Sequence, residues 1–300
     1  MTRVLVTGAS GFLGGHVLAA LRERGYDVVA LARSAAAAAT IVDHGAEPVM
    51  GDLDDPASLD AAFAEADADV LVNLASLGFG QAPAIVSAAA EVGLHRGVYV
   101  SSTAIFTTLN AASKPRRKAG EDTVTGTDLD WTVVRPTMIY GTPGDRNLAR
   151  LLQVMKRVPV LPVPGGGARL QQPVHVDDLA LAIVNALERP ESIRRAYNVA
   201  GPEAITFREL LEQAGDAVGR RPRLVPVPLG ATIGAMRLYE RLAPHPRLKA
   251  EQLERLSEDK AFSIDDARAD LGFAPRSFAD GIAAEAALLD RASSVAAGGA

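Results

Sequence analysis

The sequence predicts a doubly wound α/β fold, in which helices cover both faces of a parallel sheet. Two observations lead to this prediction. Short runs of Val and Leu alternate with Ala-rich segments of helical character through the first hundred residues. These runs are apolar throughout instead of alternating between polar and apolar residues, which is typical of strands buried on both faces. With about 150 residues per domain as a guide, the chain of 300 residues has room for a second, smaller domain.

The predicted elements follow one another in strand–helix order. Buried strands are expected at residues 4–6, 28–31, 48–50, 70–73, 97–100 and 196–200. Helices are expected at 12–24 and 34–44, and another begins at Asp55-Pro56, since proline is tolerated in a first helical turn. The stretches 159–167 and 222–228 are rich in proline or glycine, so we expect them to be irregular rather than regular elements.

Composition narrows the functional classes. The chain contains no cysteine, which excludes a disulfide framework, a thiol nucleophile and a cysteine-based metal site. Its net charge of −5 argues against a nucleic-acid partner. The longest uncharged stretch, 70–90, is interrupted by Asn73, Pro83 and two glycines, so we do not expect it to cross a membrane. The apolar run after Arg3 is too short for a secretory signal, and we expect a cytoplasmic protein.

A glycine-rich loop joins the first predicted strand to the first helix. Its glycines remove side chains where the chain must turn, approach a phosphate and pack against the sheet. The helix that follows offers free N–H groups and a positive dipole end to a pyrophosphate. We therefore expect a dinucleotide to bind here, on a Rossmann-type sheet. The loop residues assigned to the cofactor are Gly8, Ser10, Gly11, Phe12, Leu13 and Gly14.

The spacing Gly-x-x-Gly-x-x-Gly resembles that of the short-chain dehydrogenase/reductase superfamily, in particular its extended, epimerase- and dehydratase-like branch. Further matching segments occur in order at residues 52–53, 73–75, 101–103, 135–141 and 174–180. The resemblance implies that Asp52 and Leu53 contact the adenine. It also implies that the rest of the cofactor path is lined by Asn73, Leu74, Ala75, Ser101, Pro136 and Met138.

The end of the second predicted strand indicates which cofactor is used. An acidic residue about 20 residues beyond the glycine loop binds the ribose hydroxyl of NAD. Here Ala32 is followed by Arg33 and Ser34. No carboxylate repels a 2′-phosphate at this place, and Arg33 can pair with one. We therefore predict that NADP(H) is preferred over NAD(H).

The catalytic pattern of the superfamily is incomplete in this chain. The resemblance implies a Tyr-x-x-x-Lys pair assisted by a serine, and this serine position is occupied by Ser102, with Thr103 beside it. No tyrosine occurs between Thr103 and Trp131. In this respect the chain resembles atypical members that lack the tyrosine, among them lysine-dependent reductases, redox sensors and structural subunits.

Two alignments of the missing pair are open. In the first, Glu121 is matched, so that Arg117 takes the lysine position and Ser113 the tyrosine position. In the second, Lys118 is the lysine and Lys114 replaces the tyrosine. The first is preferred because Glu121 leads into the same helix pattern. The candidate catalytic residues are Ser102, Thr103, Lys114, Arg117 and Lys118.

The resemblance also implies a small lid domain over the nicotinamide, built from two separated segments. We assign residues 1–141 and 173–200 to the dinucleotide-binding domain, and residues 142–172 and 201–300 to the substrate-binding lid. The candidate substrate contacts are Phe79, Tyr140, Arg146, Asn147, Arg169 and Gln171.

One cluster suggests a metal site but is better explained otherwise. His175, Asp177 and Asp178 match a strand-to-helix corner of the superfamily, in which one of the aspartates caps the helix. The five histidines are scattered and form no metal-binding pattern, so no metal site is expected.

Three functions remain in competition. The first is an NADP(H)-dependent oxidoreductase or epimerase-like enzyme that acts on a small carbonyl or hydroxyl substrate with altered acid–base residues. The second is a dinucleotide-binding sensor or assembly protein without hydride chemistry. The third is a non-redox isomerisation or cyclisation in the same pocket. The expected partner is a small molecule, bound by a monomer or a homodimer.

Overall fold

The computed structural model describes residues 1–109, 111, 113–145, 147–243 and 253–298. Its centre is a seven-stranded sheet with the order β11-β6-β5-β4-β1-β2-β3, in which every neighbouring pair is parallel. The strands are β1 (Arg3–Thr7), β2 (Asp27–Ala32), β3 (Glu47–Met50), β4 (Val70–Asn73), β5 (Arg96–Val100), β6 (Asp130–Pro136) and β11 (Arg195–Val199). The strand order reverses between β1 and β4, which is where such sheets bind ligands. The predicted doubly wound sheet is confirmed.

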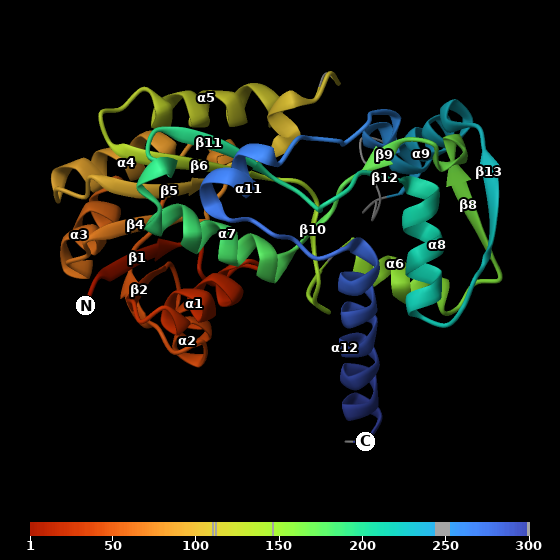
Figure 1. The fold of residues 1–300 in the computed structure, drawn as a ribbon, viewed down its shortest axis with the longest axis horizontal. Helices are drawn as coiled ribbons and strands as arrows, with labels where there is room; N and C mark the ends of the chain where they lie inside the picture. Colours follow the sequence, from red (N-terminus) through yellow and green to blue (C-terminus); the bar gives the residue numbers. More distant parts are fainter. Residues whose placement is uncertain (110, 112, 146, 244–252, 299–300) are drawn as a thin grey trace.

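Helices cover both faces of this sheet (Figure 1). One face packs against α1 (Gly14–Glu23), α2 (Ala35–Asp43), α7 (Val176–Glu188) and α11 (Asp265–Leu271). The other packs against α3 (Pro56–Ala66), α4 (Ala82–Glu91) and α5 (Ser113–Thr125). Short 3₁₀ turns are η1 (Leu77–Phe79), η2 (Thr103–Phe106), η3 (Gly165–Gly167), η4 (Pro190–Ser192) and η5 (Arg255–Ser257). Both core layers consist mainly of Val, Leu, Ile and Ala, because the chain has few aromatic residues.

Local signals explain where several helices begin. The Ser34 hydroxyl accepts the Ala37 N–H at 3.2 Å and caps α2, and the Asp55 carboxylate accepts the Ser58 N–H at 3.4 Å and caps α3. The first helix starts at Gly14, two residues later than predicted. The preceding residues are used instead in two tight turns, from Gly8 to Gly11 and from Gly11 to Gly14.

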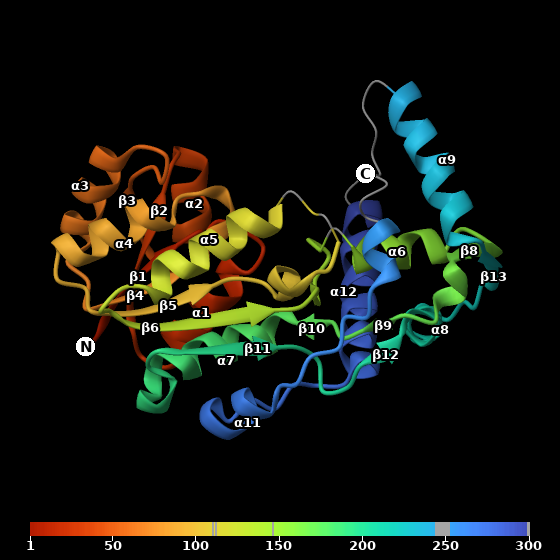
Figure 2. The ribbon, with the colours of Figure 1, turned by 90° about the horizontal axis from the view of Figure 1, so that it is seen from above.

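A second unit lies beside the end of the sheet where the strands finish (Figure 2). Its core is formed by α6 (Leu148–Met155), α8 (Phe207–Ala217), α12 (Phe278–Gly298) and the parallel pair β8 (Val160–Pro164) and β13 (Arg223–Val227). Smaller pairs are β7 (Ile139–Tyr140) with β10 (Val174–His175), and β9 (Leu170–Gln171) with β12 (Ile205–Thr206). Helix α9 (Leu229–Leu242) extends away from this unit. We refer to the unit as the lid.

The prediction of irregular structure at 159–167 and 222–228 is wrong for most of both stretches. Residues Val160–Pro164 and Arg223–Val227 pair as β8 and β13 over five positions. Each of these strands has a single neighbour in its two-stranded sheet, so a proline can direct its missing N–H away from the ladder without losing a hydrogen bond. Proline content therefore did not exclude edge strands here.

The predicted assignment of all of residues 201–300 to the lid is also wrong in one part. Helix α11 packs on the central sheet, where Ile264, Ala267, Leu271 and Phe273 lie in the same buried layer as α1 and α7. The chain thus crosses back from the lid to the sheet before it forms α12. Among the described residues, no helix combines the length and apolar character required to cross a bilayer.

Candidate dinucleotide and substrate site

The glycine loop lies at the carboxyl end of β1, against the end of β4. Gly8 has φ of +72°, and a Cβ added to it would lie 2.8 Å from the backbone nitrogen of Ala75. A Cβ on Gly14 would lie 1.8 Å from the carbonyl oxygen of Ala9. Ser10 and Gly11 between them are exposed. The backbone at the start of α1 is thus open to an anion and has no side chain in its way, which fits the pyrophosphate of a dinucleotide.

Asn73, at the end of β4, holds the backbone that packs against this loop. Its side chain is fully buried; its carbonyl oxygen accepts the Thr7 hydroxyl at 2.5 Å, and its amide donates to the Ala75 carbonyl at 3.0 Å. The Leu74 N–H donates to the Thr7 carbonyl at 3.0 Å. The Asn73 side chain is thus committed to contacts within the protein. Asn73 positions the backbone of residues 74 and 75 against Gly8.

The adenine end of the predicted path is formed by the ends of β2 and β3. Arg33 directly follows β2, is exposed, and has no hydrogen bond or ion pair to another described side chain. The two residues that follow β2, Arg33 and Ser34, carry no carboxylate. After β3, Asp52 accepts the Asp54 N–H with one oxygen at 3.0 Å, and Leu53 packs its side chain on the core next to α3.

Some predicted cofactor residues contribute only backbone or shape. The side chain of Leu13 is buried in the core, and Phe12 and Leu74 pack against the same layer. Pro136 is buried at the end of β6, and Met138 packs against the core of the lid. These residues therefore contribute apolar side chains to the packed layers. The only polar groups with which they could contact a cofactor are those of their main chain.

Ser102 is a half-buried polar residue that follows the end of β5. It is the N-cap of η2, where its hydroxyl oxygen accepts the Ala104 N–H at 3.2 Å. Its own proton has no acceptor within the part of the chain that the structure describes, so it is available to a substrate. Thr103 differs, because it is 6% exposed and its hydroxyl donates to the Pro136 carbonyl at 3.2 Å. The prediction of a catalytic role for Thr103 is therefore wrong, and its hydroxyl instead ties η2 to β6.

A buried ionic network lies directly behind Ser102. Glu121 of α5 is 4% exposed; its Oε2 accepts the Ser101 hydroxyl at 2.8 Å, and its Oε1 accepts both the Nε–H and an Nη2–H of Arg135. Arg135 also lies over the Phe106 ring, 5.3 Å from its centroid. The hydroxyl of Ser101 is therefore committed to a contact within the protein, and its predicted contact with the cofactor would have to use its main chain. The network holds β5, α5 and β6 in a fixed relation.

The four cations at the start of α5 point in different directions. Lys118 is exposed and pairs with Asp122 at 2.8 Å on the surface of α5. Arg117 packs its Cγ over Gly78 of η1, at 2.8 Å from the position of an added Cβ. Its Nε is buried and has no partner among the described residues, and burial together with the charge of Arg255 lowers its pKa. The Arg117 side chain thus packs on η1, the turn that follows β4.

Lys114 lies at the other end of the same helical turn. Its Nζ donates to the Thr107 carbonyl at 2.5 Å, in the loop that follows η2. Among the described residues no carboxylate pairs with it, so two of its three N–H donors are left for other partners. Lys114 and Ser102 are therefore held at the two ends of the segment that contains η2.

The predicted substrate residues do not form one group. Phe79 is 76% exposed on η1, and Asn147 is exposed at the start of α6. Arg169 pairs with Asp259 at 3.3 Å on the surface of the lid. Gln171 is buried in β9 and its amide nitrogen has no partner among the described residues. Arg146 lies outside the described residues.

Tyr140 is a core residue. It is 1% exposed, packs on the rings of His175 and Phe278, and has its hydroxyl directed at Gly281 of α12. Burial raises its pKa above the ordinary value. The prediction of a substrate contact by Tyr140 is therefore wrong, because α12 occupies the space in front of its hydroxyl.

The corner after β10 also differs from its prediction. The helix α7 is capped by His175, whose Nδ1 accepts the Asp177 N–H at 3.3 Å. Asp177 instead binds His16 of α1 at 2.6 Å, and Asp178 forms a bidentate pair with Arg276. The aspartates are thus crosslinks between α7 and other segments rather than caps. No cluster of three or more metal-ligating side chains occurs among the described residues.

Several buried or paired groups had no sequence signal. Glu285 of α12 is fully buried, and its Oε2 accepts the Gly141 N–H at 3.2 Å. Burial and the nearby charge of Asp145 raise its pKa to about 8. Glu258 binds the loop after η2 through several hydrogen bonds. Single glutamates in a helix or a loop look like ordinary surface residues until distant segments are placed beside them.

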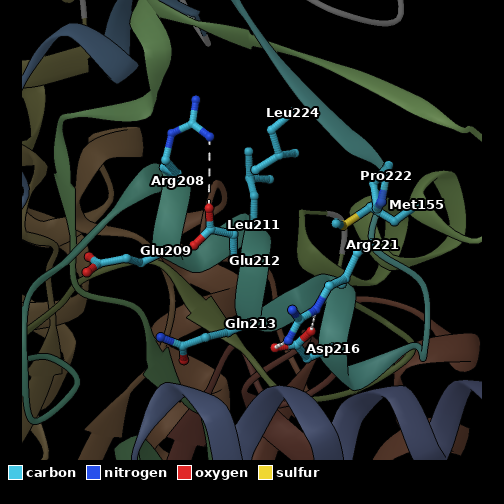
Figure 3. A pocket seen from close by; sticks show the side chains of 11 residues that line it. Met155, Arg208, Glu209, Leu211, Glu212, Gln213, Asp216, Arg221, Pro222 and Leu224 are labelled. Atoms are coloured by element: carbon cyan, nitrogen blue, oxygen red, sulfur yellow. Dashed lines mark hydrogen bonds and ion pairs between the residues drawn. The ribbon is translucent and has the colours of Figure 1, made fainter.

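A cavity of about 460 Å³ lies within the lid, between α8 and the start of β13 (Figure 3). Its charged side chains bind one another: Arg221 pairs with Asp216, and Arg208 lies 3.9 Å from Glu212. None of the residues of the glycine loop or of η2 lines it. This cavity is therefore separate from the predicted site.

The parallel sheet, the glycine loop at its strand-order reversal and the open backbone at the start of α1 define a Rossmann-type nucleotide-binding protein. Residues 8–190 match the family described as NAD(P)H-binding. The chain belongs to this family, within the extended branch of the short-chain dehydrogenase/reductase superfamily, and it lacks the tyrosine of the Tyr-x-x-x-Lys pair.

Curated relatives and solved structures agree with this assignment. The chain is 32% identical to the ceramide reductase of Caulobacter vibrioides over 75% of its own length and 73% of the relative's. It is 30% identical to the 2-alkyl-3-oxoalkanoate reductase of Stenotrophomonas maltophilia, over 91% and 95%. The fold is similar to that of the NAD-bound UDP-glucose-4-epimerase of Stenotrophomonas maltophila, with a TM-score of 0.74 over 98% and 100% of the two chains at 19% identity.

Proposed function

We propose that this protein is an NADP(H)-dependent reductase of a carbonyl compound. The observation that carries the proposal is the Ser102 hydroxyl, whose proton has no described acceptor at the end of β5, two strands from the glycine loop in the sheet. The relatives named as reductases of ceramide and of 2-alkyl-3-oxoalkanoates support reduction as the reaction. Cofactor and substrate would meet at the carboxyl edge of the sheet, below the lid.

When bound, the nicotinamide supplies a hydride to the carbonyl carbon. The chain's own contribution is to hold the carbonyl oxygen and to provide a proton. Ser102 donates its hydroxyl proton in a hydrogen bond to that oxygen, which stabilises the negative charge that develops on it. Lys114 is assigned as the proton source, because its ammonium group has donors left after the bond to Thr107. Arg117, at the lysine position of the superfamily, is assigned to the cofactor ribose.

The reaction is tested by following NADPH consumption with a panel of aldehydes, ketones and 3-oxo acids. Ser102→Ala is expected to lower kcat at least about tenfold, since one donor to the developing oxyanion is lost. The control Lys118→Ala, which breaks only the surface pair with Asp122, is expected to leave kcat unchanged. A turnover of Ser102→Ala equal to that of the wild type would rule out this mechanism.

The preference for NADP(H) is proposed from Arg33. A charge-assisted hydrogen bond to a 2′-phosphate contributes about 1.5–3 kcal/mol. Arg33→Ala is therefore expected to raise the Kd for NADPH by about 10- to 100-fold and to leave the Kd for NADH nearly unchanged. Isothermal titration of both cofactors into wild type and variant measures this. Tighter binding of NADH than of NADPH by the wild type would overturn the assignment.

A second candidate function is cofactor binding without turnover. It is favoured by the absence of a tyrosine on α5, where Ser113 takes its place in the preferred alignment. Tight NADPH binding without oxidation across the whole carbonyl panel would support a sensor or assembly protein instead of a reductase.

A further inference from the structure

A short segment after η5 connects the lid to the loop that carries the proposed catalytic groups. We call residues 258–262 the strap. On the lid side, the Asp259 carboxylate accepts the Leu170 N–H at 2.9 Å, and the Lys260 N–H donates to the Leu170 carbonyl at 2.8 Å. The Phe262 N–H donates to the Gln172 side chain at 2.8 Å. These bonds attach the strap to β9 and to the residue that follows it.

On the other side, one carboxylate makes nearly all polar contacts of the strap with the segment after η2. Glu258 accepts hydrogen bonds from the Thr107 hydroxyl, the Thr108 N–H and the Thr108 hydroxyl, each at 2.5 Å. Lys260 pairs with Glu258 at 2.6 Å, and the side chain of Glu258 is 12% exposed. Burial raises the pKa of Glu258, but the hydrogen bonds from Lys260, Thr107 and Thr108 outweigh it and lower the pKa to about 2. Glu258 is thus a carboxylate over the whole range of assay conditions.

Thr107 links this carboxylate to Lys114. Its hydroxyl donates to Glu258, while its carbonyl accepts the Nζ of Lys114 at 2.5 Å. The rings of Phe106 and Phe262 pack beside this link, 5.8 Å apart. A cavity of about 310 Å³ remains between the strap and the loop. The carbonyl that orients Lys114 therefore has its own position set by the strap.

We propose that Glu258 is a positioning residue for the reaction. It fixes Thr107, and Thr107 in turn directs the ammonium group of Lys114. The strap thereby makes the geometry of the proton donor depend on the attachment of the lid. This inference rests on the proposed reductase function, because Lys114 is assigned there as the proton source.

Glu258→Gln is the test variant. Glutamine keeps the shape of the side chain but loses the ion pair with Lys260. Its NH₂ group also faces a hydrogen-bond donor at a place where a carboxylate oxygen had accepted a hydrogen bond. We expect kcat to fall about tenfold with no change in the KM for NADPH, since the glycine loop is not touched. In a Lys114→Ala background the same substitution should have no further effect, because coupled residues are non-additive. The control is Glu254→Gln, which alters a carboxylate just before η5, outside the strap. Glu254 pairs with Arg237, and its substitution should leave kcat unchanged.

An equal loss of kcat from Glu258→Gln in the wild-type and Lys114→Ala backgrounds would overturn the proposal. A readout that does not need turnover is amide hydrogen exchange at Thr108, whose N–H is held by Glu258. Exchange at Thr108 should become faster in Glu258→Gln and stay slow in Glu254→Gln. Unchanged exchange in Glu258→Gln would overturn the inference even in an active enzyme. If exchange at Thr108 becomes faster in Glu258→Gln but the wild-type protein reduces no carbonyl, the reductase function is contradicted. The contact between Glu258 and Thr108 is supported in that case.

Discussion

Gly8→Ala is expected to raise the Kd for NADPH at least about 100-fold, which is about 2.7 kcal/mol of binding free energy. Two effects add up at this position. Alanine at φ of +72° costs about 1–2 kcal/mol of backbone strain. Its Cβ would also lie 2.8 Å from the nitrogen of Ala75, so the ends of β1 and β4 would have to move apart. The cradle for the pyrophosphate is formed by this close approach, and fluorescence or calorimetric titration of NADPH measures its loss.

Gly25 supplies the matched control. It has φ of +81°, and a Cβ added there meets nothing within 4 Å. Gly25→Ala therefore carries a similar backbone strain without the contact to another segment, at the far end of α1 from the glycine loop. We expect it to lower stability by about 1–2 kcal/mol and to leave the Kd for NADPH unchanged. Similar Kd values for the two variants would show that the approach of β1 to β4 does not determine cofactor binding.

Glu121→Ala is expected to lower the free energy of unfolding by about 3 kcal/mol. Removal of one partner of a buried ion pair costs about 3–5 kcal/mol, and the lower end applies because the Arg135 side chain is 20% exposed and retains some hydration. The Ser101 hydroxyl loses its acceptor as well. Because Ser101 precedes Ser102, we also expect kcat to fall. Urea denaturation monitored by circular dichroism measures the stability change.

Asp122→Ala, one residue further along α5, is the comparison for this loss. Its carboxylate pairs with Lys118 on the surface, where ion pairs contribute about 0.3–0.5 kcal/mol. Glu121→Gln retains an acceptor for Ser101 but loses the charge facing Arg135, so its effect should lie between the other two. A loss in Glu121→Ala no greater than that in Asp122→Ala would mean that the network does not stabilise the fold.

Periodicity and local capping were sufficient for most of the central sheet. The predicted strands before residue 101 all lie in the seven-stranded sheet, and Ser34 and Pro56 mark helix starts as expected. These signals involve only a few neighbouring residues, so they can be recognised without knowledge of the rest of the chain. The strands β8 and β13 were missed because a pairing between segments 63 residues apart leaves no local pattern when prolines interrupt both.

In the candidate site too, features that depend on residue type could be predicted, and features that depend on contacts with distant segments could not. The glycine loop could be predicted because backbone conformation at Gly8 and Gly14 depends on residue type. The contacts of Asn73, Ser101 and Thr103 could not be predicted, because a motif position does not show whether a polar side chain faces the cofactor or another strand. In the structure these three groups bind Thr7, Glu121 and Pro136. Ser102 remained available because its neighbours on both sides are turned inward.

By itself, the sequence determined the Rossmann-type fold and the glycine loop that marks the family, because these depend on residue periodicity and on glycines at defined spacings. It also showed that the usual tyrosine is absent. Only the tertiary structure decided which cations of α5 face the site, that Tyr140 is closed off by α12, and that Glu258 reaches Thr107 from a segment 151 positions away. Such contacts arise from packing between distant parts of the chain. This packing determines whether a polar side chain faces solvent or a partner.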